Sequence, residues 1–167
     1  MTADQSLTNA VFFILALAAL GGGFLAVSAR NLVRAALGLI LSFFGVAGIY
    51  FVLEAEFVAI VQVLVYVGAI SVLILFSIML TRGLMKDTTS PQNSQWLAAA
   101  GISLIMFVAL AVVVLTVNWP VSFTALKGDQ IAKLGTELVT TYVLPFEAVS
   151  LLLLGALIGA FVIAREN

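Results

Sequence analysis

The feature that most constrains this chain is an apolar stretch, Ala55–Thr81, in which Glu56 is the only charged residue. A helix of this length, at about 1.5 Å per residue, is roughly 40 Å long, whereas the hydrocarbon core of a bilayer is about 30 Å thick. The stretch is therefore predicted to cross a membrane as one helix. The composition agrees, because 63% of the 167 residues are hydrophobic and only 9% are charged. We predict an all-α integral membrane protein, with residues 1–167 forming a single membrane domain.

Five apolar segments are long enough to span the membrane. They cover approximately residues 10–28, 35–53, 55–81, 96–117 and 142–164. The start of the chain lacks the basic region of a cleaved signal peptide, so the first segment is expected to be retained. The turn at residues 54–56 is so short that the second and third spans are predicted to form an antiparallel hairpin. The polar segment 121–141 contains an apolar helical stripe that predicts a short surface helix: Ile131, Leu134 and Leu138.

Small residues in the first two spans indicate close helix packing. The run Gly21–Gly23 permits close backbone contact within a membrane bundle. Gly38, Ser42 and Gly45 follow the spacing i, i+4, i+7 and therefore share one helical face. They are predicted to form a groove for a neighbouring helix.

Basic residues predict the orientation of the chain in the membrane. Lys127 and Lys133 are on the side of the amino terminus, and the other five lie on the opposite side: Arg30, Arg34, Arg82, Lys86 and Arg165. The positive-inside rule then places the amino terminus outside and the carboxyl terminus in the cytoplasm.

The residue inventory excludes several kinds of chemistry. With no His and no Cys, the chain lacks the usual ligands of haem, zinc and iron–sulfur clusters, so we expect no catalytic centre, cofactor site or metal site on it alone. The net charge of -1 argues against a nucleic-acid partner. No acidic residue falls in the middle of a span. Glu147, the deepest, is either a proton site or a carboxylate near a helix start, and Glu54 and Glu56 suit ordinary interfacial charges.

Polar residues within the third span raise the question of function. On a regular helix, Gln62, Tyr66 and Ser77 lie within about 60° of one another. Gly68 and Ser71 then lie on the other side, where a neighbouring helix can come close. Two interpretations stay open. These residues only pack in a buried helix, or the amide and the phenol find their hydrogen-bond partners in a neighbouring helix or water.

Two motifs about 100 residues apart carry a family resemblance. Residues 56–70 read EFVAIVQVLVYVGAI and are followed by VLILF at residues 72–76. They resemble the third helix of chain J of proton-pumping NADH:quinone oxidoreductase, whose mitochondrial counterpart is subunit 6 of respiratory complex I. Residues 142–154, YVLPFEAVSLLLL, resemble the last helix of that family.

The resemblance implies a non-redox subunit of a proton-translocating complex. The flavin FMN, the iron–sulfur clusters and the quinone would be bound by other subunits. The implied partners are the membrane-arm subunits, especially a small three-helix subunit with intramembrane glutamates and the membrane subunit of the quinone module. The implied location is the bacterial plasma (inner) membrane, or the thylakoid membrane in a cyanobacterium. The alternative is a stand-alone small channel, transporter or assembly factor.

The resemblance also implies a site. The third helix of this family can carry a π-bulge, whose conversion to α-helix is proposed to open or close a water path for protons. Four residues would hold the bulge: Tyr66, Val67, Gly68 and Ala69. Val72 and Phe76 would swing into or out of the path, with Gln62, Ser71 and Glu147 as polar support. Many bacterial members have Met in place of Ser71; a polar residue there is similar to the cyanobacterial and plastid branch, which takes electrons from ferredoxin. The electron donor therefore stays open between NADH and ferredoxin.

Overall fold

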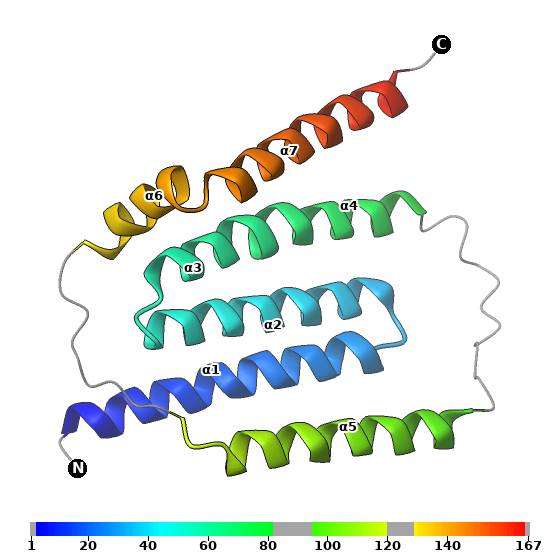
Figure 1. Ribbon diagram of the computed structural model, residues 1–167. Coiled ribbons are helices and arrows are strands. Elements are labelled where there is room, and N and C mark those ends of the chain that lie inside the picture. Colours follow the sequence, from blue (N-terminus) through cyan, green and yellow to red (C-terminus); the bar gives the residue numbers. More distant parts are fainter. Residues whose placement is uncertain (1–2, 82–94, 120–128, 166–167) are drawn as a thin grey trace. The chain divides into compact units, whose positions relative to one another are not determined.

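The computed structural model describes residues 3–81, 95–119 and 129–165, and the regular structure in these ranges is entirely helical. Figure 1 shows the elements in chain order. Their bounds are α1 Ala3–Ser28, α2 Leu32–Val52, α3 Glu56–Val61, η1 Gln62–Ile70, α4 Ser71–Thr81, α5 Trp96–Thr116, α6 Gln130–Thr140 and α7 Val143–Ala164. The chain divides into two compact units, residues 1–97 and 98–167.

Five helices are long and apolar enough to cross a membrane, as the sequence predicts. The third of them is the continuous rod of α3, η1 and α4, which runs from Glu56 to Thr81. The first begins earlier than the apolar segment, at Ala3 instead of residue 10. Apolarity sets the part that crosses the membrane, not the end of the helix, so the helix can continue into the polar segment before it. The orientation stays a prediction, and Arg82, Lys86 and Lys127 lie outside the described residues.

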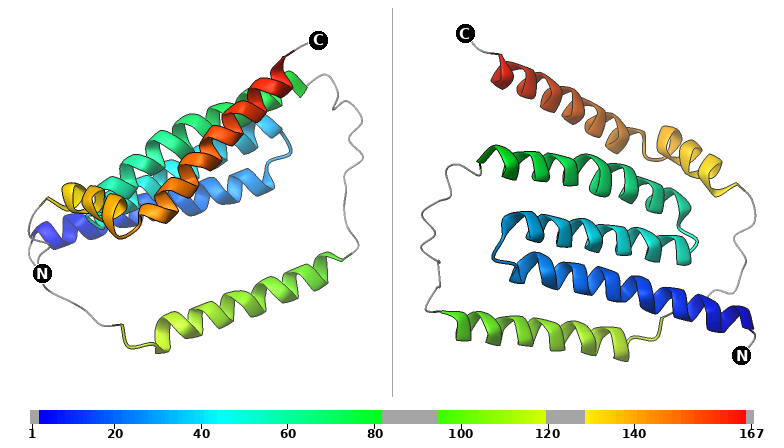
Figure 2. Two further views of the ribbon diagram at one scale, coloured as in Figure 1. Left: turned by 45° about the horizontal axis from the view of Figure 1, so that its top comes forward. Right: turned by 180° about the vertical axis from the view of Figure 1, so that it is seen from behind.

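Helix α2 is the middle helix of the first unit. It contacts α1 on one side and the rod of α3, η1 and α4 on the other. Figure 2 shows the same order of neighbours in two further views. Almost everything that the first unit buries lies on α2 or on the faces turned toward it, so the position of the third span depends on α2.

Helices α1 and α2 pack with their backbones in close approach. A Cβ atom added to Gly45 would lie 2.6 Å from the backbone nitrogen of Ala19, and one added to Gly22 would lie 2.5 Å from that of Ser42. The Ser42 hydroxyl donates a hydrogen bond of 2.8 Å to the Ala19 carbonyl across the interface. The predicted groove is confirmed, and its partner is α1. Of the three successive glycines in α1, Gly22 is the one that meets the backbone of α2.

The turn between α2 and α3 has the bond pattern of a helix C-terminus that ends in a left-handed residue. The Ala55 N–H donates to the Tyr50 carbonyl at 3.0 Å, and the Glu54 N–H donates to the Phe51 carbonyl at 3.1 Å. Glu54 takes the left-handed position, with φ 58°. The chain therefore reverses within three residues, and the predicted antiparallel hairpin is confirmed.

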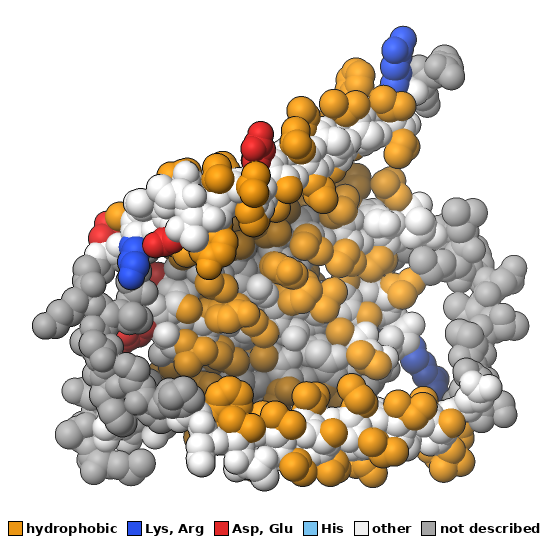
Figure 3. All heavy atoms as spheres, viewed as in Figure 1, with side chains coloured by type: hydrophobic (Ala, Val, Ile, Leu, Met, Phe, Trp, Pro, Cys, Tyr) orange, Lys and Arg blue, Asp and Glu red, His pale blue; other side chains and the backbone are white. Residues whose placement is uncertain are grey.

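The second unit contains α5, α6 and α7. The Asp129 side chain caps α6 by accepting hydrogen bonds of 3.1 Å from the N–H groups of Ile131 and Ala132. This cap and the apolar stripe explain why the predicted short helix forms, and its existence is confirmed. Hydrophobic side chains cover the face of α5 that Figure 3 presents. Exposed apolar side chains lie along the whole of α5 and, apart from Glu147 near its start, of α7, which is typical of helices that lie in a membrane.

Candidate functional site

The third span changes its helix type in the middle. Within the described ranges, η1 is the stretch that is neither α-helix nor loop, and its nine residues have π-helical hydrogen bonding. At its end the Ser71 N–H donates to the Tyr66 carbonyl, five residues back, where an α-helix would use the carbonyl four residues back. The stretch coincides with the place where the resemblance implied a bulge.

The wide turns of η1 align the two halves of the span on α2. Three residues of the span are buried, with exposed fractions of 0% for Ala59, 9% for Gln62 and 3% for Ser71. In an unbroken α-helix at about 100° per residue, Ser71 would lie about 120° from Ala59 and about 180° from Gln62. One extra residue in wide turns subtracts about 100°. All three then fall within about 80°, which explains why both halves bury one face against α2.

The prediction from a regular helical wheel was wrong for this span. It placed Gln62, Tyr66 and Ser77 on one face and Ser71 on the opposite side. Instead, Gln62 and Ser71 are buried together, while Ser77 is exposed. The Tyr66 ring packs edge-on against Phe43 of α2, with ring centroids 5.4 Å apart and an interplanar angle of 75°. The wheel fails because it adds 100° per residue through a stretch where the rotation per residue is smaller.

Gly68 has open space beside it within the described part of the chain. A Cβ atom added there would meet only the Val63 carbonyl oxygen of the same helix, at 3.4 Å. No other helix within the described ranges comes within 4 Å of this position, so none of them makes the expected close approach to Gly68. Ser71 does meet the expectation, since it is almost fully buried.

Two polar side chains of η1 have no hydrogen-bond partner within the described part of the chain. These are the amide of Gln62, a residue that is 9% exposed, and the hydroxyl of Tyr66, a residue that is 43% exposed. An unpaired polar group in hydrocarbon costs several kcal/mol. Partners from outside the described residues, such as water or a neighbouring subunit, are therefore required. This requirement distinguishes η1 from a helix whose polar residues only pack.

The two bulky residues of the candidate site lie in α4, beyond the wide turns. Val72 is 60% exposed and Phe76 is 64% exposed, so neither packs on α2. Ala69, in the last turn of η1, is exposed as well, whereas Val67 and Gly68 are half-buried. Because Val72 and Phe76 follow the wide turns, a change of helix type in η1 would rotate both by about 100° relative to α3.

The carboxylates lie away from this stretch of the sequence. Glu147 is about one turn into α7, as predicted, and is exposed. Glu54 and Glu56 are exposed at the turn between α2 and α3. The described residues contain no group of three or more acidic side chains that could hold a metal ion.

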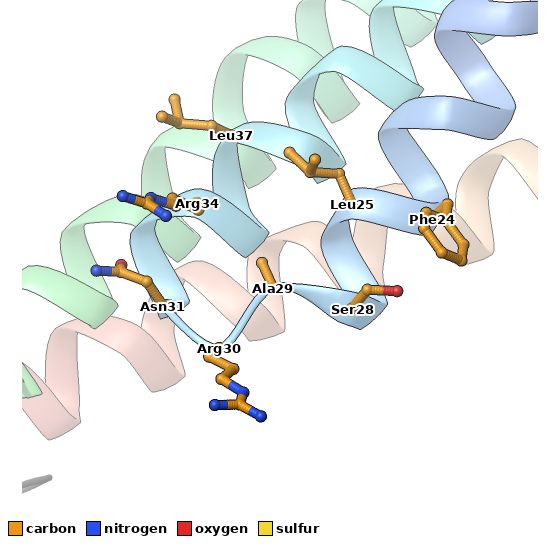
Figure 4. Close-up of a pocket in the computed structure, with 8 residues that line it drawn as sticks. All are labelled: Phe24, Leu25, Ser28, Ala29, Arg30, Asn31, Arg34 and Leu37. Carbon is orange, nitrogen blue, oxygen red and sulfur yellow. The ribbon is translucent and has the colours of Figure 1, made fainter.

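A hollow with a volume of about 380 Å³ lies at the turn between α1 and α2. Phe24, Leu25 and Leu37 form its apolar part, and Arg30 and Arg34 are the basic residues at its edge. Figure 4 shows that the two guanidinium groups point away from one another. The hollow therefore does not focus two positive charges on one point.

Comparison with known proteins gives a consistent result. Residues 22–163 match the family described as NADH-ubiquinone/plastoquinone oxidoreductase chain 6. NAD(P)H-quinone oxidoreductase chain 6 of Leptolyngbya boryana is 40% identical over 159 residues, which cover 93% of this chain and 79% of the relative. F(420)H(2) dehydrogenase subunit J of Methanosarcina mazei is 38% identical over 172 residues, which cover 98% of this chain and 94% of that relative. The chloroplastic subunit 6 of Adiantum capillus-veneris is 38% identical over 167 residues, covering 93% and 85%.

Proposed function

Because this chain belongs to the family of NADH-ubiquinone/plastoquinone oxidoreductase chain 6, we propose that its third span gates a water path that couples quinone reduction to proton translocation. The chain is a membrane-embedded subunit of a quinone oxidoreductase complex. The observation that carries the gating proposal is the π-helical stretch Gln62–Ile70 in the middle of the span.

The gate has two states that differ in the helix type of η1. With wide turns, Ala59 and Ser71 both face α2, as in the structure. With α turns throughout, one half of the span rotates by about 100° relative to the other. The rotation moves Val72 and Phe76 from one side of the span to another. Two states of one helix serve as a gate only if they differ by a few kcal/mol, so that a signal from the quinone site can shift the balance.

The polar groups of η1 suit a path of water. Gln62 and Tyr66 lack partners within the described residues, and in a membrane such groups bind water or a polar group of a neighbour. The chain has no acidic, basic or imidazole side chain between Phe57 and Thr81. The span therefore carries no group that takes up and releases protons near neutral pH, and its role is to admit or exclude the water through which protons move.

The redox chemistry belongs to other subunits. Without His and Cys, this chain lacks the usual ligands for haem and iron–sulfur clusters. The relatives carry names with different electron donors, NAD(P)H in one and F(420)H(2) in another, although both align with nearly the whole chain. What this chain contributes is therefore common to complexes with different donors. FMN or another donor-specific cofactor, the iron–sulfur clusters and the quinone site are expected on partner subunits.

The expected neighbours are other subunits of the membrane arm. Every large side chain of α5 and α7 is largely exposed within this chain, so these helices have apolar surface for lipid or for such neighbours. The small three-helix subunit with intramembrane glutamates is the expected proton-carrying partner of η1, and the quinone-module membrane subunit is the expected source of the signal. The complex is expected in a bacterial plasma membrane, or in thylakoids if the source is cyanobacterial.

Purification tests the assignment against a stand-alone channel, transporter or assembly factor. The tagged chain, extracted in mild detergent, should migrate with a very large complex that contains iron–sulfur subunits and reduces quinone. Migration as a small, isolated protein from membranes in which such a complex is active would contradict the proposal.

A further inference from the structure

Hydrogen-bond donors are unevenly distributed at the end of η1. The Tyr66 carbonyl accepts from the Ser71 N–H, and it also accepts a bond of 2.7 Å from the Ser71 hydroxyl. Both donors reach back five residues. The ordinary reach is shorter elsewhere in the chain: the Ser150 hydroxyl donates to the carbonyl of Phe146, four residues back, at 3.0 Å. One carbonyl in η1 therefore receives two donors from a single residue.

The carbonyl of Val67, the residue after Tyr66, receives no hydrogen bond from Ser71. The N–H of Ser71 reaches the carbonyls of Tyr66 and Gly68, but not that of Val67, which lies between them. The π-helical stretch ends at Ile70, so its five-residue hydrogen bonds end with that of the Ser71 N–H to Tyr66. The next donor, the Val72 N–H, is expected to pair four residues back, with Gly68, as in an α-helix. No backbone N–H remains for Val67, and the Ser71 hydroxyl is already bonded to Tyr66. We infer that the Val67 carbonyl oxygen is an open acceptor in the middle of the membrane and binds a water molecule.

The position of this carbonyl favours an occupant from outside the chain. The Tyr66 carbonyl points along the helix toward Ser71, which faces α2. By the same step of one residue, the Val67 carbonyl points toward Val72, which is 60% exposed. An unsatisfied carbonyl in hydrocarbon costs several kcal/mol, so it requires a donor. Water is the donor that fits, because Gln62 and Tyr66 leave further unpaired polar groups on the same stretch.

The water site exists in only one state of the helix, and this consequence rests on the proposed gating. When η1 adopts α turns, the Ser71 N–H bonds the carbonyl four residues back, which is that of Val67. The acceptor is then occupied and the water is released. The change of helix type thus removes the water site at the Val67 carbonyl from the path, in addition to rotating Val72 and Phe76.

A high-resolution cryo-electron microscopy map of the intact complex tests the inference. In particles with wide turns we expect a water oxygen about 2.7–3.2 Å from the Val67 carbonyl oxygen. Val72→Thr is nearly isosteric and places a hydroxyl five residues beyond Val67, as Ser71 is beyond Tyr66, so it should occupy the carbonyl and abolish the water density. Val72→Ala adds no donor and should retain the water.

The outcomes separate this site from the proposed function. Apolar atoms or a partner's side chain against the Val67 carbonyl would overturn the inference, as would water that persists in Val72→Thr. If the water behaves as expected but η1 keeps its wide turns in every class of particles during turnover, the water site stands and the gating proposal fails.

Discussion

Removal of one residue from η1 should lock the third span while preserving its packing. Ala69 is the suitable residue, because it is small, exposed and within the wide turns. The shortened span has eleven steps from Ala59 to Ser71 in place of twelve. At about 100° per residue these two then lie about 20° apart in a plain α-helix. The shortened helix therefore presents the same face to α2 without any wide turn.

The locked helix should be unable to reach a second state. A wide turn in the shortened span would rotate one half by about 100° away from α2, as Ser71 would then no longer face it. Each close pair of atoms contributes about 0.1–0.2 kcal/mol, so the loss of roughly 20 such pairs costs about 3 kcal/mol. That is about half of the roughly 5.5 kcal/mol that moves a population from 1:99 to 99:1. Two states that were equally populated before the deletion would then be populated about 99:1, so only about 1% of the molecules would occupy the rotated state.

Membrane vesicles that contain the variant complex provide the assay. We expect wild-type amounts of assembled complex, with quinone reduction and proton translocation both reduced at least about tenfold, because a coupled enzyme stalls when its gate is fixed. Deletion of Leu73 is the matched control. It also shortens the span by one residue, but in regular helix, so it should turn the rest of α4 away from α2 and impair assembly. A complex without Ala69 that assembles and translocates protons at the wild-type rate would refute the gating argument.

Three further outcomes are expected. Since the chain has no natural Cys, single cysteines introduced at Ala29 and Ala55 can be labelled without background. They should react from opposite sides of the membrane, with Ala55 outside. Reaction of both from one side would contradict the five-span topology. Glu54→Gln and Glu56→Gln should retain most quinone reductase and proton-translocating activity, because both side chains are exposed at a turn, and loss of translocation in a fully assembled complex would give these carboxylates a proton-carrying role. Tyr66→Phe keeps the ring on Phe43 and removes only the hydroxyl, so activity should fall by about fivefold, the value of one hydrogen bond, and unchanged activity would exclude the phenol from the path.

The spans could be predicted from the sequence because each depends on local composition. A run of about twenty apolar residues has to be a membrane helix, since its backbone polar groups can be satisfied only within the helix. The groove of Gly38, Ser42 and Gly45 also follows from spacing on a regular helix, and it was confirmed. That α1 is the helix packed into this groove could not be predicted, because spacing on one helix does not identify its neighbour.

The candidate site could not be predicted from periodicity. The helical wheel assumes a constant rotation, and η1 breaks that rule between Gln62 and Ser71. Residues on the two sides of η1 were therefore assigned to opposite faces although both are buried against α2. The location of the wide turns came from the family motif around Tyr66, not from composition, because a π-helical stretch has the same apolar residues as its flanks. One signal was available in retrospect: Ser71, a polar residue, pairs with Gln62 on one buried face only if a residue is inserted between them.

The most direct test of the account is the helix type of η1 during turnover. Cryo-electron microscopy of the intact complex, frozen at rest and during steady quinone reduction, can resolve whether the Ser71 N–H bonds the carbonyl of Tyr66 or that of Val67. We expect particles at rest and in turnover to contain these two arrangements in different proportions, with Val72 and Phe76 rotated by about 100° between them. A single arrangement with wide turns in every class of particles during rapid turnover would contradict it.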